Sequence, residues 1–327
     1  MRMKEISVIV PIYNVEKYIE SCLTSLENQE FDAYEVILMD DGSTDKSRDI
    51  AEQFVAKNPD KFKLFHQENA GQSAARNNGL KFACGKYIAY VDSDDTVESN
   101  YLKVMYEMAQ KTDADLVFCA FRSVDEEGNC IKEVHENGFT PGVIYNIKEE
   151  KTLLMMENSV WNKLFKREII QNEKLLFPDR VWAEDLRFTK KYLAHTSKCV
   201  YVDVPVYNYY QRSGSTLHSM KLERTKEILT ALDDVSDFYK KKGLFEYYKD
   251  EIEMIAIQEI YIYTMVKLIR SGEMEQMKSI RSEFLKRYPD FKKNKYITRL
   301  ARNRRIVYEL LNRKLYVIVK LIFMIKD

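Results

Sequence analysis

The sequence predicts an α/β protein in which helices cover both faces of a mostly parallel sheet. Its first third alternates between short apolar runs rich in β-branched residues and segments with the apolar period of a helix. This alternation is typical of parallel strands joined by right-handed crossovers. Polar residues gather where the predicted strands end, which is the edge at which open α/β sheets bind ligands.

The predicted elements form four strand and helix pairs. They are "ISVIVPIY" with "NVEKYIESCLTSLENQ", "YEVILMD" with "STDKSRDIAEQFVAK", "FKLFHQ" with "SAARNNGLKFA", and "KYIAYVD" with "ESNYLKVMYEMAQK". Asn14 and the group Ser43, Thr44 and Asp45 stand where residues that cap helix N-termini are expected. The alternation fades after about residue 112, and a later stretch that includes "EIEMIAIQEIYIYTMVKLI" has apolar residues at helical spacing.

We therefore expect three parts: an α/β domain at 1–220, a helical extension at 221–290 and a basic amphipathic tail at 291–327. The chain has 51 Lys and Arg against 51 Asp and Glu, so its net charge gives no reason to expect a nucleic-acid partner. Its five cysteines are scattered and never form C-x-x-C, which argues against a disulfide framework or a zinc site and favours the reducing cytosol. No secretory signal and no run long enough to span a bilayer is evident.

Three carboxylates crowd the end of one predicted strand. In "GKYIAYVDSDDTVESNYL" an apolar run gives way to Asp92, Asp94 and Asp95. Like charges this close repel unless a cation or several hydrogen-bond donors lie among them. One of them could simply cap the helix expected near Val97, but three exceed that task. The cluster therefore favours a metal or ligand site.

Other polar residues fall at the ends of neighbouring strands. Tyr13 ends the first strand, Asp40 and Asp41 end the second, and Arg76 follows on a helix at the same edge. Taken singly, Tyr13 could be a core aromatic residue, Asp41 a turn residue before a glycine, and Arg76 a surface partner of a glutamate. Together they indicate one binding site.

The ligand suited to this edge is a metal-bound nucleotide diphosphate. The chain has no G-x-G-x-x-G after the first strand and no G-x-x-x-x-G-K, so backbone amides of a glycine-rich loop are not the expected phosphate ligands. A divalent cation on aspartate oxygens, or Arg and Lys side chains, would neutralise a phosphate instead. An aromatic ring would stack on the base.

At these residues the chain resembles the glycosyltransferase family 2 enzymes with the GT-A fold. The segments "ISVIVPIYNVEKYIESCLTSLENQ", "EVILMDDGSTDKS", "NAGQSAARNNGLKFACGKYIAYVDSDD" and "WAEDLRF" match that family's pattern in order, over about residues 4–215. The resemblance implies a Rossmann-like GT-A domain and inverting transfer of a sugar from a nucleotide-sugar, usually a UDP-sugar, with Mn²⁺ or Mg²⁺.

The resemblance also implies roles for individual residues. Pro11 and Tyr13 correspond to the wall that binds the base, and Asp41 to the acceptor of the uracil imide. Asp92 and Asp94 correspond to the ribose-contacting and DxD positions. The expected donor-binding set is Pro11, Tyr13, Asn14, Asp41, Arg76, Asp92, Ser93, Asp94 and Arg212, and the expected metal ligands are Asp94 and Asp95.

Two sites in the second half complete the expected machinery. Asp185, after Glu184, could be a charge that stabilises a helix N-terminus; by resemblance it is the catalytic base, and inversion needs one carboxylate to take the acceptor's proton. Arg212, in "YNYYQRSGSTLHS", could clamp the diphosphate or be a surface arginine; His218 in the same loop is a weaker candidate.

The C-terminal tail combines positive charge with an apolar run, "LYVIVKLIFMI". This run is too short to cross a bilayer, but a basic segment with an apolar face can lie in an anionic membrane interface. A helix docked on the protein, or a homodimer contact, is the alternative. We expect a cytoplasmic protein at the inner face of the cell membrane.

The expected function is extension of a lipid-linked, cell-surface or capsular saccharide by a metal-dependent hexosyltransferase. A non-catalytic nucleotide-sugar sensor is the alternative of another class. The acidic cluster together with Asp185 favours the enzyme.

Overall fold

The computed structural model describes residues 4–212 and 224–324. The chain divides into two compact units, Met1–Glu150 with Met156–Ser215 and Lys151–Met155 with Thr216–Asp327. The first unit contains all the strands of the described residues, and the second is helical.

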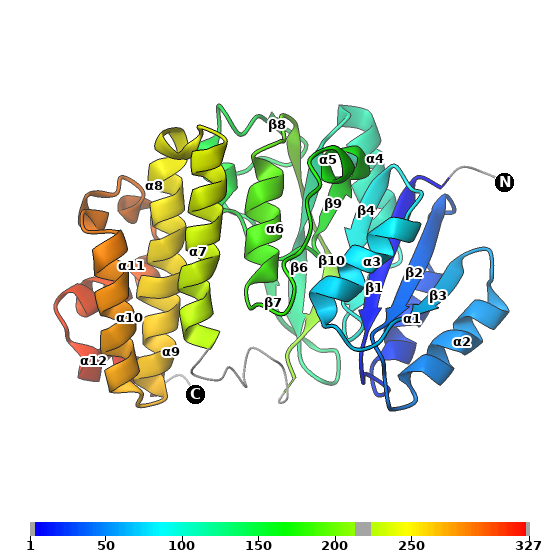
Figure 1. Ribbon diagram of the computed structural model, residues 1–327, viewed down its shortest axis with the longest axis horizontal. Helices are drawn as coiled ribbons and strands as arrows, with labels where there is room; N and C mark the ends of the chain where they lie inside the picture. The colour runs from blue at the N-terminus through cyan, green and yellow to red at the C-terminus, as the bar shows by residue number, and fades with distance from the viewer. Residues whose placement is uncertain (1–3, 213–223, 325–327) are drawn as a thin grey trace. The chain divides into compact units, whose positions relative to one another are not determined.

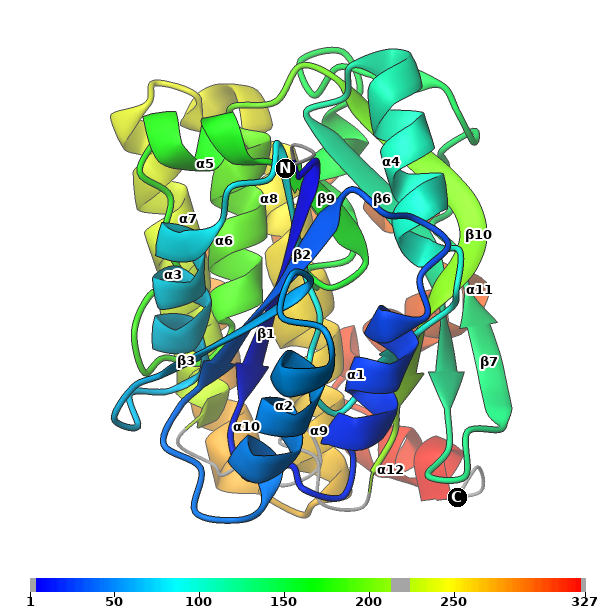
Figure 2. The ribbon, with the colours of Figure 1, turned by 90° about the vertical axis from the view of Figure 1, so that its right-hand side faces the viewer.

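The first unit is built on one sheet with strand order β3-β2-β1-β4-β9-β6-β10-β5, to which β7 adds beside β6 and β8 beside β10 (Figures 1 and 2). The strands are β1 (Ile6–Ile12), β2 (Tyr34–Asp40), β3 (Phe62–His66), β4 (Tyr87–Tyr90), β5 (Thr96–Val97), β6 (Leu116–Val124), β7 (Cys130–Val134), β8 (Ile144–Tyr145), β9 (Lys163–Lys166) and β10 (Cys199–Tyr210). The four strands β3, β2, β1 and β4 are parallel, as are β6 and β10. The predicted α/β class is confirmed.

Strand β9 is the principal departure from a simple parallel sheet. It lies between β4 and β6 and runs antiparallel to both. Because of this direction, Lys163 at its start lies toward the carboxyl end of β4, whereas Lys166 pairs with Tyr87 at the amino end of β4. The two lysines of this strand thus lie toward opposite edges of the sheet.

Helices cover both faces of the sheet, as the sequence predicts. The helices of this unit are α1 (Ile19–Glu27), α2 (Ser47–Lys57), α3 (Gln72–Phe82), α4 (Tyr101–Thr112), α5 (Arg167–Asn172) and α6 (Glu184–Leu193). In β1 the alternate residues Val8 and Val10 pack in one core with residues of α1, α2 and α4. Ile9 faces the other way, toward α3, where a Cβ on Gly79 would lie 2.6 Å from its Cγ2. The glycine lets α3 approach the sheet closely.

The second unit consists of a short segment, η1 (Lys151–Met155), and the helices after residue 223. These are α7 (Arg224–Lys241), α8 (Phe245–Ala256), the π-helix η2 (Ile257–Thr264), α9 (Met265–Arg270), α10 (Met274–Arg287), the 3₁₀ turns η3 (Phe291–Lys293) and η4 (Ile297–Arg299), α11 (Arg302–Asn312) and α12 (Tyr316–Met324). The ring of Tyr261 in η2 contacts Phe284, Phe291 and Tyr308. The basic C-terminal region therefore contributes Phe291 and Tyr308 to the core of this unit.

No helix in the two described stretches has both the length and the apolar character needed to cross a membrane.

Candidate active site

The carboxyl ends of β1, β2 and β4 bring the predicted polar residues to one edge of the sheet. Ile12 at the end of β1 pairs with Asp40, and the Asp41 amide donates to the Ile12 carbonyl. On the other side of β1, the Val91 amide donates to the Ile9 carbonyl, which places Asp92 just beyond. The parallel register thus converts sites far apart in sequence into one polar edge.

The loop after β1 is fixed by the loop after β2. Asn14 has a left-handed backbone, its amide donates to Ser43 Oγ, and its side-chain oxygen accepts from the Thr44 amide at 2.8 Å. Tyr13 stays 49 % exposed, so it is not a core residue and its ring is available for stacking. Pro11, by contrast, is buried within β1.

Asp41 is 3 % exposed and already serves the protein's own backbone. Its carboxylate accepts from the Ala70 and Gly71 amides, both at 2.8 Å, and from Gln67 at 2.7 Å. These bonds fix the start of α3. Little of the Asp41 carboxylate therefore remains open to a ligand. The sequence does not show that these donors lie beside it.

Arg76 of α3 is the electrostatic centre of the site. Its side chain is 1 % exposed and binds Asp185 at 2.6 Å and Asp92 at 2.8 Å, with Glu184 at 3.5 Å. The surface alternative for Arg76 is therefore wrong. One buried guanidinium joins the end of β4 to the start of α6, which satisfies the rule that buried charges are paired.

The pKa of Asp185 is raised to about 7. Burial is the largest cause, and the negative charges of Glu184 and Asp92 add to it, while Arg76 and a hydrogen bond from the Val160 amide act in the opposite direction. A carboxylate that titrates near neutral pH is well matched to accepting a proton under physiological conditions. Its side chain keeps 22 % of its surface exposed, so a substrate can reach it.

Asp94 and Asp95 occupy different environments. Asp94 is 25 % exposed and forms an ion pair with Arg212, whose guanidinium lies over the ring of Tyr18. Asp95 is 2 % exposed, and its oxygens accept from Tyr207 Oη at 2.8 Å and the Tyr210 amide at 2.9 Å. Burial raises the pKa of Asp95 well above its ordinary value.

Ser93, between these aspartates and Asp92, is buried, and His218 lies outside the described residues. Among the residues that the structure describes, no three His, Cys, Asp or Glu side chains converge as a ready-made metal site. Asp94 is the more exposed of Asp94 and Asp95, and its partner in the structure is the guanidinium of Arg212. One aspartate fits the way Mg²⁺ is commonly held, by one or two carboxylates with substrate phosphates and water.

A cavity of about 330 Å³ opens beside the Arg212 guanidinium. Its lining includes Asn14, Tyr18, Asp45 and Arg212, and so joins the loops after β1 and β2 to the end of β10. Tyr18 and Tyr207 were not predicted as site residues. Both lie in segments of helix or strand period, so nothing in the sequence separates them from core aromatics.

Comparison with known proteins agrees with this geometry. The model of the family described as Glycosyl transferase family 2 matches residues 7–174. EpsH of Bacillus subtilis is 30 % identical over 289 residues, which cover 86 % of this chain and 83 % of EpsH.

Two solved structures share the fold. One is Staphylococcus aureus TarS 1–349 in complex with UDP-GlcNAc, with TM-score 0.72, 23 % identity and coverage of 95 % of this chain and 92 % of that one. The other is the mannosyltransferase PcManGT of Pyrobaculum calidifontis in complex with GDP-Man and Mn²⁺, with TM-score 0.58, 15 % identity and coverage of 98 % and 86 %. The sheet edge carries the family's acidic motifs, and the family model matches half of the chain's length. This chain therefore belongs to glycosyltransferase family 2.

Proposed function

We propose that the protein transfers a hexose from a UDP-sugar to a hydroxyl group of a saccharide acceptor, with inversion, during assembly of a cell-surface or capsular polysaccharide. The observation that carries this proposal is the buried Arg76, which holds Asp92 at the donor edge and Asp185 at the start of α6 within one ion-pair cluster. A binding module that does no chemistry has no need of a partly exposed carboxylate with a pKa near neutrality.

In the proposed reaction Asp185 is the general base. It takes the proton of the acceptor hydroxyl as that oxygen forms a bond to the anomeric carbon, and the bond from that carbon to the diphosphate oxygen breaks on the opposite face. The proton ends on Asp185, and the electron pair of the broken bond leaves with UDP. Inversion follows from a single displacement.

The donor is proposed to lie along the edge formed by the ends of β1, β2 and β4. The exposed Tyr13 ring stacks on the base, Asn14 and Asp41 shape the loops beside it, and Asp92 meets the ribose. Arg212 leaves Asp94 for the diphosphate, because a guanidinium fork can bind two phosphate oxygens at once. UDP is the favoured nucleotide because TarS is described with UDP-GlcNAc; GDP, described for PcManGT, is the competing outcome of a donor screen.

Mn²⁺ or Mg²⁺ would be held by Asp94, with Asp95 bonded behind it to Tyr207. When bound, such an ion supplies positive charge that stabilises the departing diphosphate. The structure of PcManGT with Mn²⁺ supports a metal in this fold.

A donor screen tests the proposed function directly. UDP-sugars, UDP and GDP-mannose are compared by thermal shift with and without Mn²⁺, since a true donor raises the melting temperature by mass action. The best ligand is then offered with saccharide acceptors, and release of UDP is measured. Stabilisation by a UDP-sugar without transfer or hydrolysis would instead support the non-catalytic sensor.

Replacing Asp94 tests the proposed metal site. Asp94→Ala removes the open carboxylate, so we expect UDP binding to lose its dependence on Mn²⁺ and transfer to fall below detection. Calorimetry of UDP binding with and without Mn²⁺ measures the first effect. Glu98→Ala, at a partly exposed ion pair with Arg122, is the matched control and should retain both properties. Unchanged metal-dependent binding in Asp94→Ala would contradict the assignment.

The second unit is proposed to contact an anionic membrane surface at the inner face of the cell membrane. Val317, Ile318 and Leu321 of α12 are 74 %, 42 % and 51 % exposed, and Arg313 and Lys320 are exposed near them. Apolar side chains beside cations suit the boundary between headgroups and acyl chains. A lipid-linked acceptor would lie at the same surface.

Flotation with liposomes tests the membrane contact. The intact protein should float with anionic vesicles at low salt and less at high salt, since each Lys or Arg near such a surface contributes about 1 kcal/mol. The double variant Val317→Glu with Leu321→Glu should lose flotation, whereas Ile131→Glu, at an apolar residue of β7 that is 55 % exposed, should not. If the double variant floats as well as Ile131→Glu, α12 is not the membrane-binding surface. If the double variant changes only the mass measured by sedimentation, α12 forms a dimer contact instead.

A further inference from the structure

A loop beside the site, residues 157–162, is organised by a buried lysine. Lys163 at the start of β9 has no exposed surface. Its ammonium donates to the carbonyls of Glu157 at 2.9 Å and Ser159 at 2.7 Å, and to Asn162 Oδ1 at 2.8 Å. All three of its N–H donors are thereby used. A buried charge is costly unless it is fully bonded, so the three bonds account for a lysine where a strand core would otherwise accept an apolar residue.

Helix α6 holds the same loop from its other side. The Thr189 hydroxyl donates to the Asn158 carbonyl at 2.9 Å, and the buried Lys190 ammonium donates at 2.7 Å to the carbonyl of Met156, the residue before the loop. Asn162 is itself fixed, because its amide donates to the Cys119 carbonyl of β6. The loop is tied to β6, β9 and α6 by side chains inside the protein.

Two residues of this loop reach the proposed catalytic groups. The Val160 amide hydrogen-bonds to the carboxylate of Asp185. The Trp161 ring stacks on Tyr207, with ring centroids 4.4 Å apart. The Tyr207 hydroxyl in turn donates to Asp95 and accepts from the Asp92 amide. The loop thus touches the proposed base at one residue and supports the acidic cluster at the next.

We propose that Lys163 is a positioning residue for the transfer reaction, which holds loop 157–162 so that the Val160 amide meets Asp185 and the Trp161 ring supports Tyr207. Lys163 contacts no reacting atom and acts through the loop. The inference rests on the proposed function, in which Asp185 is the base. It gives the "WNK" of the sequence a role that spacing alone does not suggest.

The charges that face Asp185 set the sign of the expected effect. Arg76 and the Val160 amide stabilise its ionised form, Glu184 and Asp92 destabilise it, and the Lys163 charge interacts favourably with it from behind the loop. Without the ammonium the loop loses its three hydrogen bonds to Lys163, and Asp185 loses a favourable charge. Both changes raise the pKa of Asp185, because a lost hydrogen bond to the ionised form disfavours that form.

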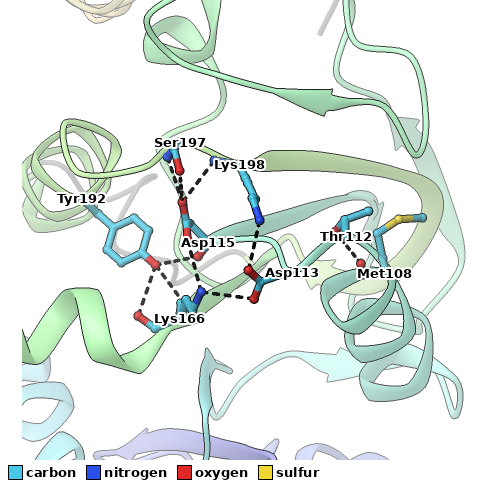
Figure 3. A network of polar contacts seen from close by, with 8 residues as sticks. All are labelled: Met108, Thr112, Asp113, Asp115, Lys166, Tyr192, Ser197 and Lys198. Atoms are coloured by element: carbon cyan, nitrogen blue, oxygen red, sulfur yellow. Dashed lines mark hydrogen bonds and ion pairs between the residues drawn. The ribbon is translucent and has the colours of Figure 1, made fainter.

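The test compares two Lys→Met changes in one strand. Lys163→Met should lower kcat by at least about tenfold with little change in the Kd for UDP, and should move the acid limb of the rate profile up by about one pH unit, the scale of one lost hydrogen bond to a charge. Lys166→Met is the matched control. Its ammonium pairs with Asp113 at 3.3 Å and Asp115 at 3.5 Å at the opposite edge (Figure 3), so its pH profile should equal that of the parent.

A second readout does not depend on turnover. Titration of ¹³C-labelled aspartate carboxyls by NMR, with the Asp185 signal assigned from Asp185→Asn, gives the pKa of Asp185 directly. An upward shift in Lys163→Met but not in Lys166→Met supports the inference. An unchanged Asp185 pKa in folded Lys163→Met overturns it, whether or not transfer has been detected. Failure of the unsubstituted protein to transfer any sugar would instead overturn the proposed function.

A milder set of variants covers the case in which Lys163→Met does not fold. Lys163→Gln retains two N–H donors without the charge, and Val160→Pro removes the amide donor while leaving Lys163 intact. Each should raise the pKa of Asp185. If Val160→Pro folds and leaves that pKa unchanged, the loop does not act on the base and the inference fails.

Discussion

Carboxylates lie at both edges of the central sheet, but Glu35 at one edge and Asp95 and Asp185 at the other are held in opposite electrostatic states. At the amino ends of the strands, Glu35 of β2 is fully buried and accepts from Ser7 at 2.8 Å, from Cys84 and from Lys63 at 2.7 Å. Burial alone would raise its pKa, but these donors outweigh burial and lower it from 4.5 to about 2. At the carboxyl ends, burial raises the pKa values of Asp185 and Asp95.

The difference separates a carboxylate that the protein itself saturates from those that are proposed to take part in the reaction. Both oxygens of Glu35 have donors within the protein, so its ionised form is stabilised and neither oxygen is left for a substrate. At the same edge Lys166 pairs with both Asp113 and Asp115, and the Tyr192 hydroxyl donates to the Asp115 carbonyl (Figure 3). At the carboxyl edge the negative charges exceed what Arg76 balances, which is the arrangement expected where a cationic or proton-donating ligand binds.

The largest effect expected from this comparison is the loss of turnover in Asp185→Asn. The amide retains the shape of the side chain but is a very poor proton acceptor, so transfer should fall by at least about 10²-fold while UDP affinity stays near that of the parent. Initial rates of UDP release and calorimetry measure the two quantities. Asp113→Asn, which changes an exposed carboxylate of the opposite edge, should leave both unchanged.

A surviving rate in Asp185→Asn would break the comparison. It would place the base elsewhere, with Glu184, 3.5 Å from Arg76, as the next carboxylate to replace. If both asparagine variants lost activity equally, the two edges would not differ in function, and their different pKa values would reflect stability alone.

Much of this contrast could be predicted from the sequence. Strand and helix periods predict the parallel strands, and the rule that strand ends share an edge predicts that Tyr13, Asp41 and Asp92 lie together. The resemblance of the motifs to family 2 adds expected roles, and family membership is confirmed. The donor, metal and base assignments remain predictions.

The parts that could not be predicted depend on long-range packing. Arg76 meets Asp185 although 109 residues separate them, and nothing local distinguishes a helical arginine at the surface from one buried among carboxylates. Strand β9 has only four residues, too few for its antiparallel place between β4 and β6 to be read from periodicity. Asp95 resembles Asp94 in sequence, yet the hydroxyl of Tyr207, 112 residues away, turns it into a buried acceptor.

The smallest effect expected is on the free energy of unfolding, and it tests the role of Glu35 at the amino edge. The pKa of Glu35 is lower in the folded protein than in the unfolded chain, so its contribution to the free energy of unfolding is fully present above pH 4.5 and is lost as the pH falls toward 2. The full difference in pKa corresponds to about 3 kcal/mol, and we expect about 2 kcal/mol because Lys63 is half exposed and its charge is screened.

Glu35→Gln should therefore lower the free energy of urea unfolding by about 2 kcal/mol at pH 7, and the gap to the parent should close as the pH approaches 2. Its transfer rate and the pKa of Asp185 should not change, because the strands separate the two clusters. If the difference in unfolding free energy between Glu35→Gln and the parent persists at low pH, the amino edge requires the packing of this side chain and not its charge. The electrostatic contrast between the two edges would then rest on Asp185 and Asp95 alone.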